Sequence, residues 1–261
     1  FHLYDVQVLN RVTWDNIIIP PDATELGWKD TVRVSPLEDT YFAIRTIIPV
    51  LPWELPNSVR FLNRMMPPLD TSMFNPTDVN GNPTNPIVNQ LVNFGWEYML
   101  HCHILSHEEM DMMRPVAVAM PPIAPDGLAW SVTGNGNRTA LTLTWNDNSI
   151  NETEFVIQRD NGTGAWVDLG VSSSPLDLPN THGIRSFTDT TFRMNSTPYA
   201  YRVVARNTVG YGTEYPSLSV QSVSGSVAAI SGPSNLLATL QAGPQVSLTW
   251  TDNAINETGF I

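Results

Sequence analysis

Short runs of alternating apolar and polar residues recur along the chain and predict β-strands. Residues 41–48, Tyr-Phe-Ala-Ile-Arg-Thr-Ile-Ile, are rich in the aromatic and β-branched side chains that strands favour. Leu141, Leu143 and Trp145 occupy every second position, which places them on one face of a strand. The same alternation recurs at Tyr199, Tyr201, Val203 and Ala205. Because prolines and polar turns separate these runs, the pattern predicts an all-β fold.

Two segments interrupt this pattern. Residues 63–90 are rich in Asn, Pro and Met and have no period, which predicts a long surface loop. Residues 121–127, Pro-Pro-Ile-Ala-Pro-Asp-Gly, predict a stiff linker between two β domains. We therefore expect one domain over residues 1–122 and a second over residues 123–230.

A repeat marks the C-terminal part of the chain. The run that begins at Leu141 recurs from Val246, with Trp250 in the place of Trp145. A period as long as a domain indicates tandem modules. Residues 231–261 contain little beyond the repeated run, so we expect a truncated second copy with too few strands to bury a core of its own.

Composition and charge limit the classes of partner. The 261 residues are 42% hydrophobic and 15% charged, which is compatible with a globular chain. The formal net charge of −12 argues against nucleic acid and anionic membrane surfaces, both of which attract basic patches. No apolar run in the sequence is long enough to span a membrane. The single cysteine can form no internal disulfide, so cysteine usage leaves the cellular compartment open.

Most of the candidate chemistry lies in residues 101–113, His-Cys-His-Ile-Leu-Ser-His-Glu-Glu-Met-Asp-Met-Met. This segment holds the only cysteine of the chain and three of its five histidines. A thiolate, two imidazoles and a weak thioether bond form a site that suits copper moving one electron at a time. Cys102, His107 and Met112 can supply three of those four ligands.

His101 and His103 flank Cys102 at a spacing of two residues. On an extended strand, both imidazoles project from one face and the sulfur from the other, so one strand can contact two metal sites. The pattern of His-Cys-His, three residues, His, four residues and Met resembles the last copper motif of the multicopper oxidases. Together with residues 111–115 and 25–32, it looks most like the branch that contains the spore-coat laccase and bilirubin oxidase.

The resemblance implies a role for each of these residues. In the family, a His-Pro-x-His-x-His motif runs into a strand like that of residues 1–11, so His2 looks like the last histidine of that motif. The implied ligands of the type 1 copper, which accepts electrons from the substrate, are Cys102, His107 and, as a weak axial ligand, Met112. The implied ligands within the type 2/type 3 trinuclear copper cluster, which reduces dioxygen to water, are His2, His101 and His103. Electrons can pass between the two sites through the backbone of Cys102.

The same resemblance implies the architecture. Residues 1–122 look like the C-terminal cupredoxin domain of an oxidase, a Greek-key β-sandwich, without its N-terminal part. By that alignment, the second histidine of the type 1 site and further cluster ligands lie outside this chain, so we expect the chain alone to be inactive. Residues 123–230, with Asn207 and Gly210, resemble a fibronectin type III β-sandwich, and residues 231–261 resemble the start of a second one.

Some residues allow two interpretations. Glu108 follows His107, where related laccases carry an acid that helps to deliver protons for oxygen reduction; otherwise it is an exposed turn carboxylate. Met65, Met66 and Met73 can form a platform for cuprous ions, although loop packing explains them more simply.

Three further features are interpreted structurally. His182 lies away from every metal motif and is expected at the surface. Loops around Asp147 and Asp252 offer oxygen ligands for calcium, but the spacing is not that of an EF-hand, and turns between strands are preferred. Asn-x-Ser/Thr sequences, which are glycosylated only in a suitable secretory host, begin at Asn137, Asn151, Asn161, Asn195 and Asn256.

Two functions follow from these features. The first is a laccase-like copper oxidoreductase that oxidises phenolic, pigment or metal-ion donors in one-electron steps and reduces dioxygen to water. The second is a non-catalytic copper-binding or scaffold domain whose fibronectin-like tail mediates attachment. From the fibronectin-like tail we expect a cell-surface or extracellular partner and a secreted, periplasmic or cell-surface location.

Overall fold

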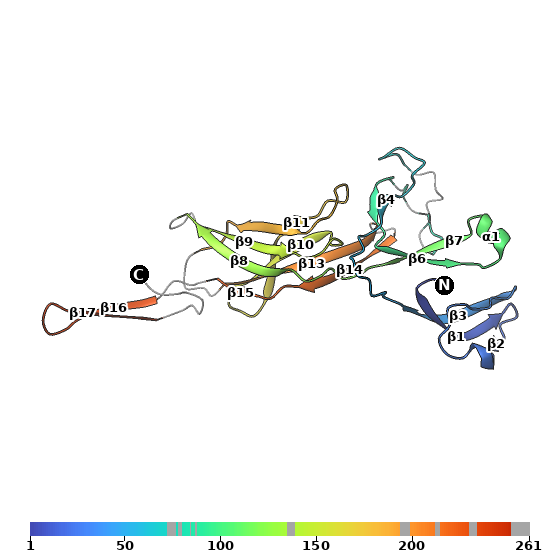
Figure 1. The fold of residues 1–261 in the computed structure, drawn as a ribbon, viewed down its shortest axis with the longest axis horizontal. Helices are drawn as coiled ribbons and strands as arrows, with labels where there is room; N and C mark the ends of the chain where they lie inside the picture. Colours follow the sequence, from blue (N-terminus) through green and yellow to red (C-terminus); the bar gives the residue numbers. More distant parts are fainter. Residues whose placement is uncertain are drawn as a thin grey trace. The chain divides into compact units, whose positions relative to one another are not determined.

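The regular secondary structure of the computed structural model consists almost entirely of β-strands (Figure 1). It describes residues 1–71, 77, 80–83, 85, 86, 88–134, 139–193, 199–211, 215–229 and 234–251. The only α-helix in these ranges is α1 (Leu105–Glu109), so the predicted all-β class is confirmed. In the same ranges, no helix has the length and apolar character needed to cross a membrane. The chain divides into two compact units, Phe1–Glu54 with Trp96–Val118 and Leu55–Gly95 with Ala119–Ile261.

Two small antiparallel sheets form the first unit. In one sheet β1 lies between β2 and β3, and in the other β6 pairs with β7. The strands are β1 (Tyr4–Thr13), β2 (Ile18–Ile19), β3 (Glu38–Thr46), β6 (Trp96–His101) and β7 (Met113–Val118). Most of the run predicted as a strand at residues 41–48 lies in β3.

Alternate residues of β1 are buried in this unit. Tyr4, Val6 and Val8 are almost fully buried. The ring of Tyr98 on β6 meets Tyr4 edge to face, with centroids 5.1 Å apart, and the Tyr98 hydroxyl donates to the Ile47 carbonyl at 2.7 Å. Burial, and then the neighbouring Tyr98, raises the pKa of Tyr4 to about 12. The aromatic pair therefore joins β1 to β6 through apolar contact.

Arg11 on β1 anchors the segment between β2 and β3. Its side chain is only 4% exposed, bonds both carboxylate oxygens of Glu25 at 2.7 Å, and lies 3.1 Å from Glu38. Glu25 ends the 3-10 helix η1 (Ala23–Glu25). The hydrogen bonds from Arg11, and then that from the Asp22 backbone N–H, lower the pKa of Glu25 to about 2. A two-point bond between guanidinium and carboxylate is the strongest geometry for such a pair.

The second unit contains a β-sandwich. One sheet has the order β12-β9-β8, and the other contains β11, β10 and β13, with β14 and β15 also paired to β13. The strands of the first sheet are β8 (Asp126–Thr133), β9 (Ala140–Asp147) and β12 (Gly183–Asp189). Those of the second are β10 (Glu154–Asp160), β11 (Trp166–Ser173), β13 (Ala200–Tyr211), β14 (Tyr215–Val223) and β15 (Val227–Ala228).

The core of the sandwich forms from both sheets. Its buried members are Leu141, Leu143, Trp145, Phe155, Ile157, Phe192, Tyr201, Val203, Ala205 and Ala229. The rings of Trp145 and Phe155 pack with centroids 5.6 Å apart, and Tyr199 packs at the edge of the cluster. The two alternating runs predicted from the sequence are thus confirmed as strands with one buried face.

Residues 55–95 extend the second sheet of the sandwich. β5 (Leu91–Asn93) pairs with β13 through Asn93 and Gly210, and β4 (Val59–Phe61) pairs with β5. The segment therefore groups with the residues that follow the linker. The domain boundaries expected at residues 122 and 230 stay predictions.

The segment between β4 and β5 is the loop predicted at residues 63–90. Its described residues form turns and isolated β-bridges. Asn89 is fully buried within it, and its side-chain Nδ2 donates to the carbonyls of Asn63 and Met66 at 2.9 Å each. The buried Asn89 amide thus ties residues 63 and 66 to residue 89, because buried donors need a partner.

The second copy of the repeat forms a two-stranded sheet, β16 (Ser234–Leu240) with β17 (Val246–Thr251). Trp250 is 41% exposed, whereas Trp145 at the same place in the first copy is 1% exposed. Two strands alone provide no second layer to cover their apolar side chains. Residues 231–233 and 252–261, including Asp252, lie outside the described ranges.

We predict that Glu25→Gln lowers the melting temperature of the first unit at neutral pH, because it breaks the two-point bond with Arg11. Since the pKa of Glu25 is depressed, its contribution is fully present above the unfolded value of 4.5 and is lost as the pH falls toward about 2. Calorimetric melts of both forms from pH 7 to pH 2 measure this difference. Asp39→Asn, a matched change at an exposed position of β3, is the control. A pH-independent difference would contradict the assignment.

Candidate metal centre

The start of the chain and the end of β6 lie side by side in the first unit. The His2 N–H donates to the Met99 carbonyl at 2.8 Å, and the two residues form an antiparallel bridge. Leu3 then has a positive φ of 64°, a conformation that costs a non-glycine residue about 1 kcal/mol or more. β6 ends at His101, so the extended strand considered for residues 101–103 stops at its first residue. His2, two residues before β1, thus meets His101 at the end of β6.

Three imidazoles converge at this point. Ring centroids lie 4.4 Å apart for His101 and His103, 4.9 Å for His2 and His101, and 5.6 Å for His2 and His103. One ligand nitrogen of each ring lies within 4.8 Å of the others. The Nε2 atoms of His2 and His101 are 2.7 Å apart, so one ring donates a hydrogen to the other. The structure therefore brings together the three histidines that the resemblance assigns to the copper cluster.

The surroundings favour the neutral form of at least one of these rings. Desolvation, and then the charges of the amino terminus, His101 and His103, lowers the pKa of His2. Neutral imidazole is the form that binds metal ions, and imidazole nitrogen is a preferred ligand of copper. The three side chains therefore fit a copper-binding role by both position and chemistry.

Cys102 and His107 form a second pair of candidate ligands. The Cys102 Sγ lies 3.6 Å from the His107 Nδ1, and Cys102 is a free, partly buried cysteine. His107 lies on α1, whose first turn is closed by the His107 N–H donating to the Ile104 carbonyl at 2.8 Å. The sequence pattern did not predict this helix. By turning the chain after residue 104, α1 returns His107 to the sulfur of Cys102.

Met112 follows α1 in a turn. Its N–H donates to the His107 carbonyl at 3.1 Å, after Asp111 with a positive φ of 59°. The Met112 side chain is 51% exposed. Its role as the axial ligand of a copper stays a prediction.

Glu108 contacts the histidine group directly. Its Oε1 lies 3.4 Å from the Nδ1 of His101, which is also 3.1 Å from the Cys102 carbonyl oxygen. Metal-bound imidazoles usually direct their second nitrogen to an oxygen of this kind. The sequence alone did not identify the outer partner of any histidine. The Nε2 of His101 lies next to His2 and its Nδ1 next to Glu108. His101 therefore has the geometry of a metal ligand whose second ring nitrogen contacts an outer partner.

The other sequence candidates lie in the second unit or outside the described residues. Met65 is 91% exposed and Met66 is half-buried, whereas Met73 lies outside the described ranges. His182 is exposed, as expected. Asp147 is buried, accepts from the Ser149 N–H at 3.2 Å and bonds Arg185 at 3.1 Å. Its carboxylate therefore already has a cationic partner.

Two glycosylation sequences can be placed in the structure. Asn161 lies in an exposed loop, but Asn151 is buried and its side chain donates to the Met120 carbonyl at 3.1 Å. A glycan on Asn151 would not fit the folded module. Asn137, Asn195 and Asn256 lie outside the described residues.

A family model described as multicopper oxidase matches residues 65–121. The matched range contains His101, Cys102, His103, His107 and Met112. This match, over part of the chain, supports a copper-dependent oxidase in general, and the matched family implies a small-molecule reductant and dioxygen. Comparisons with curated proteins and with solved structures gave no match.

We predict that His103→Gln weakens the binding of Cu²⁺ to this chain by more than about tenfold, because even outer partners of a metal ligand are worth that much. Isothermal titration of the purified chain with Cu²⁺ gives the affinities. His182→Gln, which removes an exposed histidine from the second unit, should leave the affinity unchanged. Equal loss in both variants would mean that copper binds histidine nonspecifically.

We predict that Met112→Leu raises the reduction potential of the type 1 copper in the whole oxidase and keeps its blue absorption. Removing a weak thioether donor destabilises the oxidised copper, and the axial ligand tunes the potential of such sites. Redox titration of both proteins provides the comparison. An unchanged or lower potential would mean that Met112 is not the axial ligand, and Met110 or Met113 would then be tested.

Proposed function

We propose that residues 1–122 are the C-terminal copper-binding domain of a laccase-like oxidase, of the branch that contains the spore-coat laccase and bilirubin oxidase. One observation carries the proposal. The ring of His101 stacks on those of His2 and His103, while the sulfur of Cys102 is directed to His107. Three consecutive side chains thus belong to two ligand groups, His101 and His103 to one and Cys102 to the other. Such a segment is suited to join two redox sites.

The residues of the chain have separate tasks in this proposal. Bound copper would supply one-electron oxidation of the donor and reduction of dioxygen. Cys102 and His107 hold the electron-accepting site, and His2, His101 and His103 contribute to the oxygen-reducing site. Because Cys102 is bonded to both neighbouring histidines, the backbone offers an electron a path through covalent bonds from the thiolate to either imidazole.

Glu108 is proposed to hold a proton next to the oxygen-reducing site. Its carboxylate lies 3.4 Å from the Nδ1 of His101 and is about one quarter exposed. A carboxylate that contacts both solvent and a ligand histidine can take up a proton from water and deliver it inward. Oxygen reduction to water consumes protons, so such a group serves the proposed reaction.

The proposed ligand side chains are fewer than a type 1 site and a trinuclear cluster need, so we expect residues 1–261 alone not to turn over. Donors in the proposal are phenols, pigments or metal ions. The fibronectin-like residues 123–230, and the start of a second copy at 231–261, would attach the oxidase to a surface or extracellular partner. This tail supports a secreted, periplasmic or cell-surface location.

We predict that Cys102→Ser in the whole oxidase removes the intense blue thiolate absorption and abolishes oxygen consumption with a phenolic donor, because the thiolate is both ligand and electron path. Absorption spectra and an oxygen electrode measure the two effects. Met65→Leu, at an exposed methionine outside the ligand set, is the control and should change neither.

Two outcomes would decide against the proposal. Blue absorption that survives Cys102→Ser would show that this cysteine is not a copper ligand. A wild-type protein that binds copper and consumes no oxygen would favour the non-catalytic scaffold instead.

A further inference from the structure

The chain passes between its two compact units three times, at residues 54–55, 95–96 and 118–119. Within the second unit, a residue close to each crossing bonds to the same side chain. These three residues are Asn57, Asn93 and Met120, and their shared partner is Asn207 on β13. One buried amide is therefore connected to the chain near every crossing.

Asn207 is fully buried and uses its whole hydrogen-bonding capacity. Its Oδ1 accepts from the Nδ2 atoms of Asn57 at 3.2 Å and Asn93 at 2.9 Å. Its Nδ2 donates to the Asn57 Oδ1 at 3.2 Å and to the Met120 carbonyl at 2.9 Å. A primary amide offers two donors and two acceptor lone pairs, so no capacity remains for water.

The partners of Asn207 are themselves held. The Asn57 Nδ2 also donates to the Asn151 carbonyl at 2.7 Å, and the Asn151 Nδ2 donates to the Met120 carbonyl at 3.1 Å. A cluster of amides that bond one another resists local opening, because each broken bond leaves a buried polar group without a partner.

Asn93 connects this cluster to the residue before β6, the strand that ends at His101. Its Nδ2 donates to the Thr208 carbonyl at 2.8 Å, and its Oδ1 accepts from the Gly95 N–H at 2.8 Å. Gly95 immediately precedes β6, which begins at Trp96 and ends at His101. The hydrogen bonds thus fix the backbone up to the first residue of that strand.

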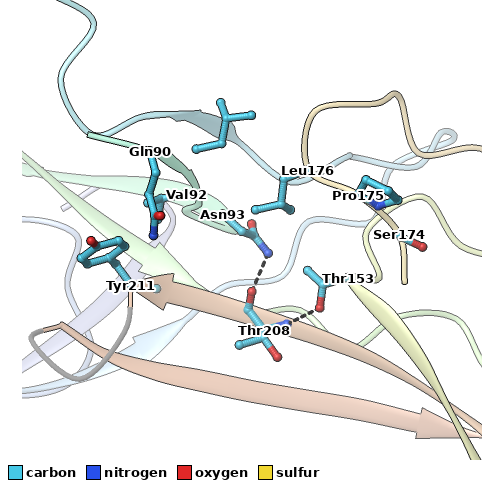
Figure 2. A pocket seen from close by; sticks show the side chains of 11 residues that line it. Gln90, Val92, Asn93, Thr153, Ser174, Pro175, Leu176, Thr208 and Tyr211 are labelled. Carbon is cyan, nitrogen blue, oxygen red and sulfur yellow. Dashed lines mark hydrogen bonds between the residues drawn. The ribbon is translucent and has the colours of Figure 1, made fainter. Parts of the chain in front are cut away.

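Figure 2 shows Asn93 directed to Thr208, and both residues line a cavity of about 360 Å³. Thr208 in turn donates its N–H to the Oγ1 of Thr153 at 3.1 Å. The apolar part of the wall includes Leu91 and Leu176. The cavity therefore lies where β5 packs against the sandwich, and the polar groups of its wall bond one another.

We propose that Asn207 is a positioning residue that fixes all three chain crossings and thereby the start of β6. The effect on copper rests on the proposed function, whereas the effect on the crossings does not.

The test compares Asn207→Asp with Asn161→Asp in the whole protein. Aspartate has the shape of asparagine, but its carboxylate loses both donors and turns an oxygen toward the Asn57 Oδ1 and the Met120 carbonyl. Asn161 lies in an exposed loop of the same module and controls for the added charge. Hydrogen exchange by mass spectrometry measures the crossings, and the blue absorption and electron paramagnetic resonance spectra measure the copper site.

In Asn207→Asp, we expect exchange at residues 55–58, 91–95 and 119–121 to accelerate at least about tenfold, since each unpaired buried group destabilises the closed state by that order. We expect exchange in β6 to rise as well, and the copper spectra to shift while copper content is retained. Asn161→Asp should match the wild type in every measurement.

Unchanged exchange at the crossings in Asn207→Asp would overturn the proposal. Faster exchange at the crossings with an unchanged β6 and unchanged copper spectra would overturn the positioning role. If Asn207→Asp does not fold, Asn57→Ala removes one arm of the cluster and should accelerate exchange at 55–58 and 119–121 alone; no change there would equally overturn the proposal. A wild type that binds no copper would defeat the proposed function, and exchange would still decide whether Asn207 holds the crossings.

Discussion

The backbone hydrogen bond from His2 to Met99 is the constraint on which the candidate metal centre depends. It places the segment before β1 against β6, so that a histidine at position 2 reaches two histidines about a hundred positions later. Behind it, the buried rings of Tyr4 and Tyr98 pack edge to face and hold the same two strands together. The imidazoles are therefore positioned by strand pairing and aromatic packing, and a metal ion would find them already assembled.

The second constraint is the position of Cys102 between two histidines. Its neighbours are directed toward His2, while α1 brings His107 back to the sulfur at 3.6 Å. Two ligand groups therefore share one short segment of backbone. Glu108 adds an acid on the far side of His101. This arrangement explains why a run of eight residues can carry most of the chemistry of the chain.

The sequence predicted those features that leave a local signature. Alternation at Leu141, Leu143 and Trp145 gave the buried face of a strand, because a strand repeats every two residues. The spacing of His101 and His103 similarly predicted that their imidazole rings project from the same face of the chain. The five-residue helix α1 is too short to show a helical period, so it could not be predicted in this way.

Contacts between distant segments leave no such signature. No local pattern in the sequence pairs Asn207 with Asn93, yet both are buried and bonded to each other. The docking of residues 55–95 on β13 depends on these amides and on a single pair of strand residues. The contact of Glu108 with His101 likewise depends on where α1 begins, which the sequence pattern did not predict.

Copper-edge X-ray absorption on the copper-loaded oxidase tests the central claim most directly, because it reports the ligand atoms of the metal. The account predicts one copper with a sulfur ligand from Cys102 and a separate set of coppers bound by imidazole without sulfur. His2→Gln should reduce the imidazole contribution and leave the copper–sulfur component intact. A spectrum without copper–sulfur scattering, or one in which His2→Gln removes the sulfur component, would contradict the division of this segment between two sites.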